Sequence, residues 1–163
     1  MYKRQLAARV PEGVETVGVF RGQPVDEVVA LARAAGLSTV QLHGDESPDE
    51  VAAVRDAGFR VVRAVSAETW AAETPEQRAA PGEDLLLLDA VEPGGGTAFD
   101  AAHLAAATPD RPWVLAGGLR PDTVADLVAE LRPWGVDVSS GVESSRGVKD
   151  VALVRAFVAA ARG

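Results

Sequence analysis

The chain has 163 residues, with 16 lysines and arginines against 24 aspartates and glutamates, and a formal charge of −8 with both histidines neutral. This length suits one domain with a real core, and the 47% hydrophobic content excludes a disordered chain. The acidic balance argues against a nucleic-acid partner, and the lack of cysteine excludes disulfides, thiolate metal sites and a cysteine nucleophile within this sequence.

The sequence carries no pattern typical of a membrane or secreted protein. No apolar run approaches the ~18 residues that a spanning helix needs. The basic N-terminus, Met1–Gln5, is not followed by the apolar segment of a signal peptide. We therefore expect a cytoplasmic protein without membrane contact.

Apolar, strand-like runs alternate with helical patterns through the first half of the chain. The predicted strands are Thr16–Phe20, Thr39–Leu42, Arg60–Val65 and Asp84–Leu88, and the predicted helices are Val25–Ala35, Ser47–Ala57 and a weaker Ala67–Ala80 interrupted by Pro75. Ser47 and Glu50, with Pro48 at the first helical position, predict a capping box. The continuous apolar run Leu85–Leu88 is typical of a strand covered on both faces, as in a parallel sheet.

The second half repeats this alternation. The predicted helices are Phe99–Ala107, Pro121–Leu131 and Asp150–Ala161, and the predicted strands are Trp113–Leu115 and Val136–Val138. In the last helix we expect Asp150 to be the N-cap, with an inward face made of Val151, Val154, Phe157 and Val158. The three tryptophans, Trp70, Trp113 and Trp134, are expected to pack in the core.

Six strands alternating with helices predict an α/β protein with a parallel sheet. Two architectures compete, a doubly wound sheet and a (β/α)₈ TIM barrel. The first strand is not followed by the Gly-x-Gly-x-x-Gly motif of dinucleotide-binding sheets. Glycines instead follow the last two strands, where barrels place a phosphate site, and this favours the barrel.

Two small-residue turns follow those last strands. The first contains Gly117 and Gly118, and the second contains Ser140 and Gly141. Glycines let a backbone approach a ligand closely, and backbone N–H groups at a helix start bind anions. Each turn alone is compatible with an ordinary strand-to-helix connection, but the pair predicts a phosphate site.

Other candidate site residues also follow strands. Asp89 ends the buried run and suits a general acid, although it would equally cap the next turn. His43 would polarise or hydrogen-bond a substrate, or be structural. Gly95 and Gly96 lie in a glycine run that would fold over a substrate or be a flexible loop. No metal-binding motif is present, so no metal is expected.

Several motifs agree in order and spacing with those of one enzyme family. They are Val17–Phe20, Val40–Gly44, Leu86–Asp89, Gly94–Gly96 with Phe99 and Asp100, Ala116–Leu119, and Asp137–Glu143 with Gly147–Asp150. From about Leu6 to the C-terminus, the chain resembles phosphoribosylanthranilate isomerase. The resemblance implies a TIM barrel and the Amadori rearrangement of N-(5′-phosphoribosyl)anthranilate to 1-(2-carboxyphenylamino)-1-deoxyribulose 5-phosphate, a step of tryptophan biosynthesis.

The resemblance also implies roles for residues. It makes Asp89 the general acid, and it places the substrate phosphate at Gly117, Gly118, Ser140 and Gly141. No cofactor is implied, because the imine formed by the substrate's own nitrogen acts as the electron sink. One departure lies beside the first turn, where Arg120 replaces the family's common asparagine and weakens the N-cap of the next helix.

The general base implied by the family is a cysteine on its first strand, and this sequence has no cysteine. Thr16–Phe20 resembles the family's third strand, so the sequence predicts a single partial barrel of about six βα units, equivalent to strands 3–8, over residues 1–163. Residues 1–5 match nothing recognised in the family. We therefore expect little or no turnover from these residues alone, and restored activity when the two missing strands are supplied.

An open barrel would leave two sheet edges unpaired, at Thr16–Phe20 and at Val136–Val138. Self-association or marginal stability is therefore expected. Two alternatives to the isomerase remain open, a non-catalytic sugar-phosphate-binding barrel fragment and another phosphate-binding barrel enzyme.

Overall fold

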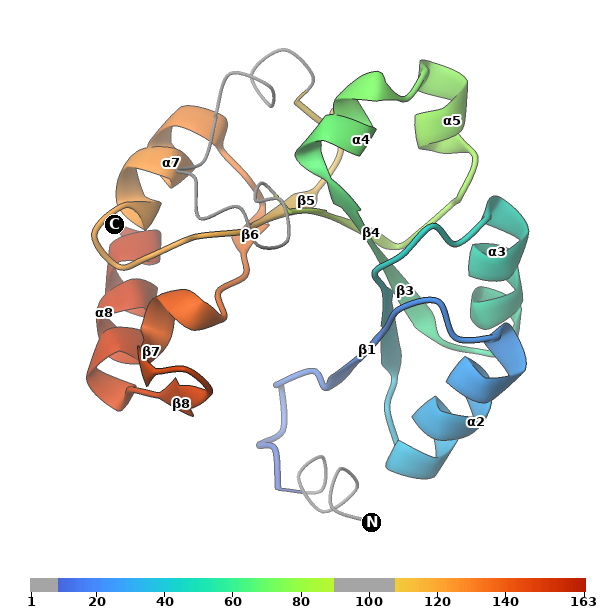
Figure 1. The fold of residues 1–163 in the computed structure, drawn as a ribbon, viewed down its shortest axis with the longest axis horizontal. Helices are drawn as coiled ribbons and strands as arrows, with labels where there is room; N and C mark the ends of the chain where they lie inside the picture. The colour runs from blue at the N-terminus through green and yellow to red at the C-terminus, as the bar shows by residue number, and fades with distance from the viewer. Residues whose placement is uncertain (1–8, 90–107) are drawn as a thin grey trace. The chain divides into compact units, whose positions relative to one another are not determined.

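The computed structural model describes residues 9–89 and 108–163 (Figure 1). The strands are β1 Val17–Phe20, β2 Thr39–Leu42, β3 Arg60–Ser66, β4 Leu85–Asp89, β5 Trp113–Ala116, β6 Gly135–Val136, β7 Glu143–Ser145 and β8 Val148–Lys149. The helices are α2 Val25–Ala35, α3 Pro48–Asp56, α4 Ala67–Ala72, α5 Pro75–Ala79, α7 Val124–Leu131 and α8 Val151–Arg162, with a short 3₁₀ helix η1 Ser140–Val142. The predicted helix Phe99–Ala107 lies outside the described residues.

The strands β1 to β6 form one sheet in chain order, which confirms the predicted α/β class with a parallel sheet. Val17 pairs with Thr39 and Thr39 with Arg60, so consecutive strands keep a regular parallel register. In this strand order β1 and β6 are the two end strands. The described residues fall into two compact units, one within Met1–Ala64 with Glu73–Leu86 and one within Val65–Ala72 with Leu87–Gly163.

The first unit is a layer of strands covered by helices (Figure 1). Its core joins the inward residues of α2, α3, β2 and β3, and consists of Val28, Ala32, Val40, Leu42, Val51, Val54, Phe59 and Val61. In α2, Val28 and Ala32 are four residues apart and so lie on one face. These two residues therefore form the buried face of this helix.

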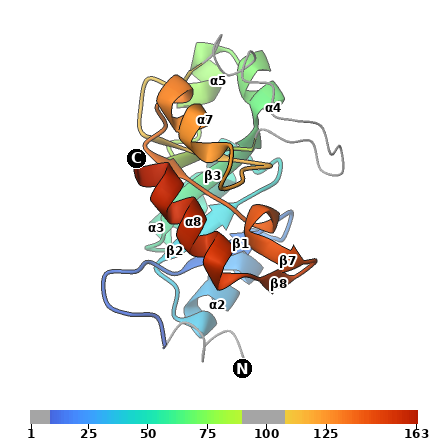
Figure 2. The same cartoon turned by 90° about the vertical axis from the view of Figure 1, so that its left-hand side faces the viewer.

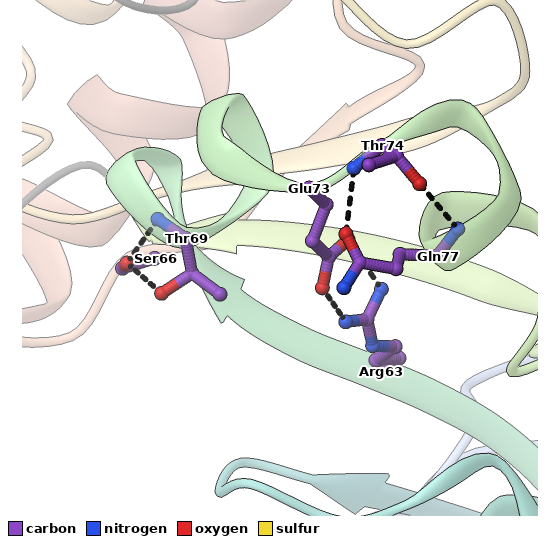
Figure 3. Close-up of polar contacts among 6 residues, drawn as sticks. All are labelled: Arg63, Ser66, Thr69, Glu73, Thr74 and Gln77. Carbon is purple, nitrogen blue, oxygen red and sulfur yellow. Dashed lines mark hydrogen bonds and ion pairs between the residues drawn. The ribbon is translucent and has the colours of Figure 1, made fainter.

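Two helices of the first unit begin with a capping box. At α3, the Ser47 side chain accepts a hydrogen bond from the Glu50 backbone, and Glu50 accepts one in return from the Ser47 backbone at 2.8 Å, as predicted. At α5, Thr74 and Gln77 form the same reciprocal pair (Figure 3). Pro75, which we expected to interrupt one helix, is the first residue of a new helix, because its fixed φ suits that position.

The second unit carries the C-terminal elements. Strand β6 is Gly135–Val136, shorter than the predicted Val136–Val138, although the Asp137 N–H still donates to the Leu115 carbonyl of β5 at 2.8 Å. The strands β7 and β8 then form an antiparallel hairpin that the sequence did not predict. Figure 2 shows this hairpin at one end of α8, where Asp150 caps the helix by accepting from the Ala152 and Leu153 N–H groups.

Two predictions about buried side chains are wrong. Of the four residues expected on the inward face of α8, only Phe157 is buried, whereas Val151 is 65% exposed and Val154 and Val158 are also exposed. Trp70 and Trp113 are in the core, but Trp134 is 70% exposed because it lies in the connection before β6. Helical periodicity gives the orientation of an apolar face, but burial also requires an element that covers it.

An ion pair with little solvent exposure joins β3 to the segment before α5. Arg63 donates through both terminal nitrogens to the Glu73 carboxylate, with 3.3 Å between Nη1 and Oε2, and the two side chains are only 12% and 14% exposed (Figure 3). A second arginine of the same strand, Arg60, pairs with Glu15 at 59% and 41% exposure. Solvent screens the second pair much more than the first.

The two arginines of β3 permit a matched test. Arg63→Gln leaves the Glu73 carboxylate without its partner at low exposure, and we expect it to lower the free energy of unfolding by about 2 kcal/mol. Arg60→Gln removes an exposed pair and is expected to cost at most about 1 kcal/mol. Urea unfolding of both variants measures the difference, and equal losses would contradict this interpretation.

Candidate functional site: two turns at the ends of β5 and β6

The first turn follows a fully buried strand. All four residues of β5 are buried, and the chain then passes through Gly117 and Gly118 with φ of 93° and 62°. These left-handed conformations favour glycine, so the sequence at this turn is set by its backbone shape. Leu119 is buried again, which anchors the far side of the turn.

Helix α7 starts later than predicted. It begins at Val124 rather than Pro121, and no side chain caps its first N–H groups. The Arg120 carbonyl instead accepts from the Thr123 and Val124 N–H groups. The N-cap of α7 is Thr123 and not Arg120, so the expected weakening of the N-cap by Arg120 stays a prediction.

The second turn packs directly against the first. A Cβ built on Gly141 would lie 1.8 Å from the Leu119 carbonyl oxygen and 3.2 Å from Val138 Cγ2. Real carbon and oxygen atoms do not approach so closely, so only glycine fits. The structure thus places Gly141 against Leu119, the residue that follows Gly117 and Gly118, and η1 starts at Ser140.

The hairpin β7–β8 supports the second turn. The Lys149 ammonium donates to the Ser139 carbonyl at 2.8 Å, to Ser139 Oγ at 3.3 Å and to Glu143 Oε1 at 2.7 Å. Glu143 Oε2 accepts from the Gly147 N–H at 2.9 Å. The hydrogen bond and charge of Lys149, with the Gly147 N–H, lower the pKa of the Glu143 carboxyl.

The other predicted residues are placed as follows. Asp89 is the last residue of β4 and is half-buried, in the second unit with the two turns. His43 belongs to the first unit and follows β2, where it is half-buried, its N–H donates to the Phe20 carbonyl and its Nδ1 lies 3.2 Å from Gln41 Nε2. Gly95 and Gly96 lie outside the described residues.

Within residues 9–89 and 108–163 the structure shows neither a metal-binding cluster nor a membrane-spanning helix. In those ranges no group of three or more histidine, cysteine or acidic side chains is arranged to hold a metal ion. In the same ranges no helix is long and apolar enough to cross a membrane.

Comparisons with known proteins identify the family of the chain. A family model described as N-(5′-phosphoribosyl)anthranilate (PRA) isomerase matches residues 2–160. The chain belongs to the PRA isomerase family. The resemblance drawn from the sequence motifs is therefore confirmed.

Relatives share both sequence and fold with this PRA isomerase family member. An isomerase from Chromohalobacter salexigens is 44% identical over 94% of this chain and 72% of its own length. The crystal structure of TrpF from Jonesia denitrificans is 47% identical, with a TM-score of 0.85 over 99% of this chain and 77% of that one. The chain thus spans about three quarters of such relatives, and its parallel sheet matches their TIM-barrel-type fold.

A further solved relative carries a ligand. It is 30% identical, with a TM-score of 0.80 over 99% of this chain and 78% of that one. It is described as PRA isomerase in complex with reduced 1-(o-carboxyphenylamino)-1-deoxyribulose 5-phosphate.

Sequence reasoning missed the supporting residues of the second turn. Lys149 and Glu143 were noticed only as parts of motifs, and no role was expected for either. Their spacing of six residues around Gly147 was a usable signal, because a glycine turn between opposite charges favours a short hairpin.

The contact between the two turns predicts a strong effect of a single methyl group. Gly141→Ala places a Cβ against the Leu119 carbonyl, and we expect it to lower the free energy of unfolding by about 2 kcal/mol or more. In Gly135→Ala, the matched control in β6, the nearest atom, Val114 Cγ2, would be 3.6 Å away. Thermal unfolding should show a loss of stability for Gly141→Ala only. A Gly141→Ala variant as stable as wild type would contradict the contact.

The lowered pKa of Glu143 predicts a pH dependence of stability. Its ionised form is favoured in the folded chain, so its contribution is complete above the unfolded value of 4.5 and is lost as the pH falls through the lower folded value. Wild type should therefore be more stable than Glu143→Gln above pH 4.5, and the difference should shrink on acidification. Urea unfolding across this pH range measures it, and a constant difference would contradict the assignment.

Proposed function

We propose that the chain acts as N-(5′-phosphoribosyl)anthranilate isomerase, in the Amadori rearrangement that leads toward tryptophan. The proposal rests on the contact between Gly141 and the Leu119 carbonyl, which joins the turns after β5 and β6. The chain belongs to the PRA isomerase family, and these turns are its candidate phosphate site. The isomerase relatives support this function, and no comparison supports the non-catalytic or other-enzyme alternatives.

The substrate phosphate would bind at the two joined turns. Gly117 and Gly118 have φ values of 93° and 62° and no side chains, and Ser140 and Gly141 lie at the start of η1, so backbone N–H groups of both turns would donate to the phosphate. This is the usual TIM-barrel arrangement, in which the loops after the last two strands and a short extra helix hold a phosphate. Backbone donors bind an anion without net positive charge, which reconciles an acidic protein with a phosphorylated substrate.

The reaction needs an acid and a base but no cofactor. Asp89 would protonate the furanose ring oxygen, so that the C1–O bond breaks and the substrate nitrogen forms a C1=N iminium. A base then removes the C2 proton, and the electron pair moves toward nitrogen to give an enolamine. C1 then gains a proton as the C2 hydroxyl loses one, which yields the C2 ketone, so the product is an isomer of the substrate.

We infer that these 163 residues lack the general base that removes the C2 proton. The family resemblance implies a cysteine on a strand preceding the equivalent of β1, and the sequence contains no cysteine. The described elements would then correspond to strands 3–8 of the barrel. The exposed apolar residues Val151, Val154 and Val158 on α8, and Val19 on the end strand β1, support this partial barrel and a tendency to self-associate.

The experiment separates binding from turnover. The 163-residue chain is titrated with inorganic phosphate and with the reduced product analogue, and product formation is measured for it and for a version extended by the first two βα units of the Jonesia relative. We expect binding in both, slow turnover in the first and much faster turnover in the second. Asp89→Asn in the extended version should lower turnover about 100-fold or more without weakening phosphate binding.

Asp126→Asn, on the exposed side of α7, is the matched control and should leave turnover unchanged. Failure of wild type to bind phosphate would overturn the site. Turnover by the 163-residue chain as fast as that of the extended version would overturn the missing-base inference. An active Asp89→Asn variant would overturn the assignment of the acid.

A further inference from the structure

We propose that Lys149, held in place by Glu143, is a positioning residue that aims the Ser140 N–H group at the substrate phosphate. This inference rests on the proposed function. Its main structural evidence is the hydrogen bond that the Lys149 ammonium donates to the Ser139 carbonyl at 2.8 Å. Nothing in the phosphate-binding role of the turns themselves requires this contact.

The planar peptide bond links the two residues. The Ser139 carbonyl and the Ser140 N–H belong to the same peptide unit, and in a trans peptide they point in opposite directions. Fixing the carbonyl therefore fixes the direction of the N–H. The same carbonyl accepts from the Val142 N–H at 3.4 Å, a long hydrogen bond, so Lys149 supplies the shorter of its two contacts.

Glu143 makes the lysine a rigid support. Its Oε1 accepts from the Lys149 ammonium at 2.7 Å and its Oε2 from the Gly147 N–H, so both carboxylate oxygens are held within the hairpin. The Glu143 side chain is 14% exposed. A flexible lysine would otherwise lose much of its side-chain freedom to make one contact, and the preformed pair reduces that entropic cost.

The charges distinguish positioning from direct phosphate binding. A carboxylate next to an anion site repels the ligand, so removing the Glu143 charge should strengthen phosphate binding if only electrostatics matter. If Glu143 positions Lys149, and Lys149 positions the turn, removal of the Glu143 charge should weaken phosphate binding. The two roles therefore predict effects of opposite sign for one isosteric substitution.

The test uses the 163-residue chain and inorganic phosphate as the probe. Dissociation constants are measured for wild type, Lys149→Gln, Glu143→Gln and the double variant, and backbone amide NMR shifts are followed at Ser140 and Gly118. We expect about tenfold weaker phosphate binding in each single variant and little further loss in the double variant. At saturating phosphate the Ser140 amide should respond much less than in wild type, whereas the Gly118 amide should respond as before.

Arg155→Gln, an exposed cation on α8, controls for the loss of one positive charge and should leave phosphate affinity unchanged. Stronger binding by Glu143→Gln would overturn the proposal in favour of direct charge effects. Equal loss of response at Ser140 and Gly118 would overturn it in favour of a general structural role. Absence of phosphate binding in wild type would overturn the proposed function itself, whereas unchanged affinity in the variants would overturn only the role of Lys149.

Discussion

The close approach of the Gly141 backbone to the Leu119 carbonyl is the constraint on which the candidate site depends. There is no room for a Cβ, so the two turns meet backbone to backbone. The strands deliver them to this contact, because Val114 pairs with Gly135 and the Leu115 carbonyl accepts from the Asp137 N–H. A sequence change that moved either strand end would separate the backbone donors of the proposed phosphate site.

Ion pairs with at least one little-exposed partner lie where the chain leaves a strand. In the first unit, Arg63 on β3 holds Glu73 before the start of α5. In the second unit, Lys149 holds both Glu143 and the Ser139 carbonyl after β6. Arg63 contacts only the Glu73 side chain, whereas Lys149 also bonds a backbone carbonyl in an irregular segment. Such contacts order a segment, which matters more for a site than their contribution to global stability.

The features that were predicted from sequence are those set by local residues. The capping box at Ser47 and the N-cap at Asp150 depend on side chains within three positions of the helix start. The same Thr/Ser-Pro-x-Gln/Glu pattern recurs at Thr74, so the start of α5 was predictable, although Pro75 was interpreted as an interruption. The buried strand Leu85–Asp89 was predicted from a continuous apolar run, and the two glycine turns were predicted from small residues that follow strands.

The features that were not predicted depend on contacts distant in sequence. Periodicity predicted an inward face on α8, but Val151 and Val154 are exposed because no described element covers them. The hairpin Glu143–Lys149 has strands of three and two residues, too short for an alternating pattern, and Glu143 bonds both the Lys149 ammonium and the Gly147 N–H within it. The need for glycine at position 141 comes from Leu119, which is 22 positions earlier and belongs to another turn.

That contact also bears on how the protein can be recombined with its relatives. A chimera whose crossover falls between residues 119 and 139 would combine a first turn from one parent with a second turn from another. Because the two backbones are in close contact, small differences between the parents in the position of a strand end would produce a clash or a gap between the turns. Residues 117–119 and 139–142 should therefore come from the same parent, and a loop exchange should transfer both segments together.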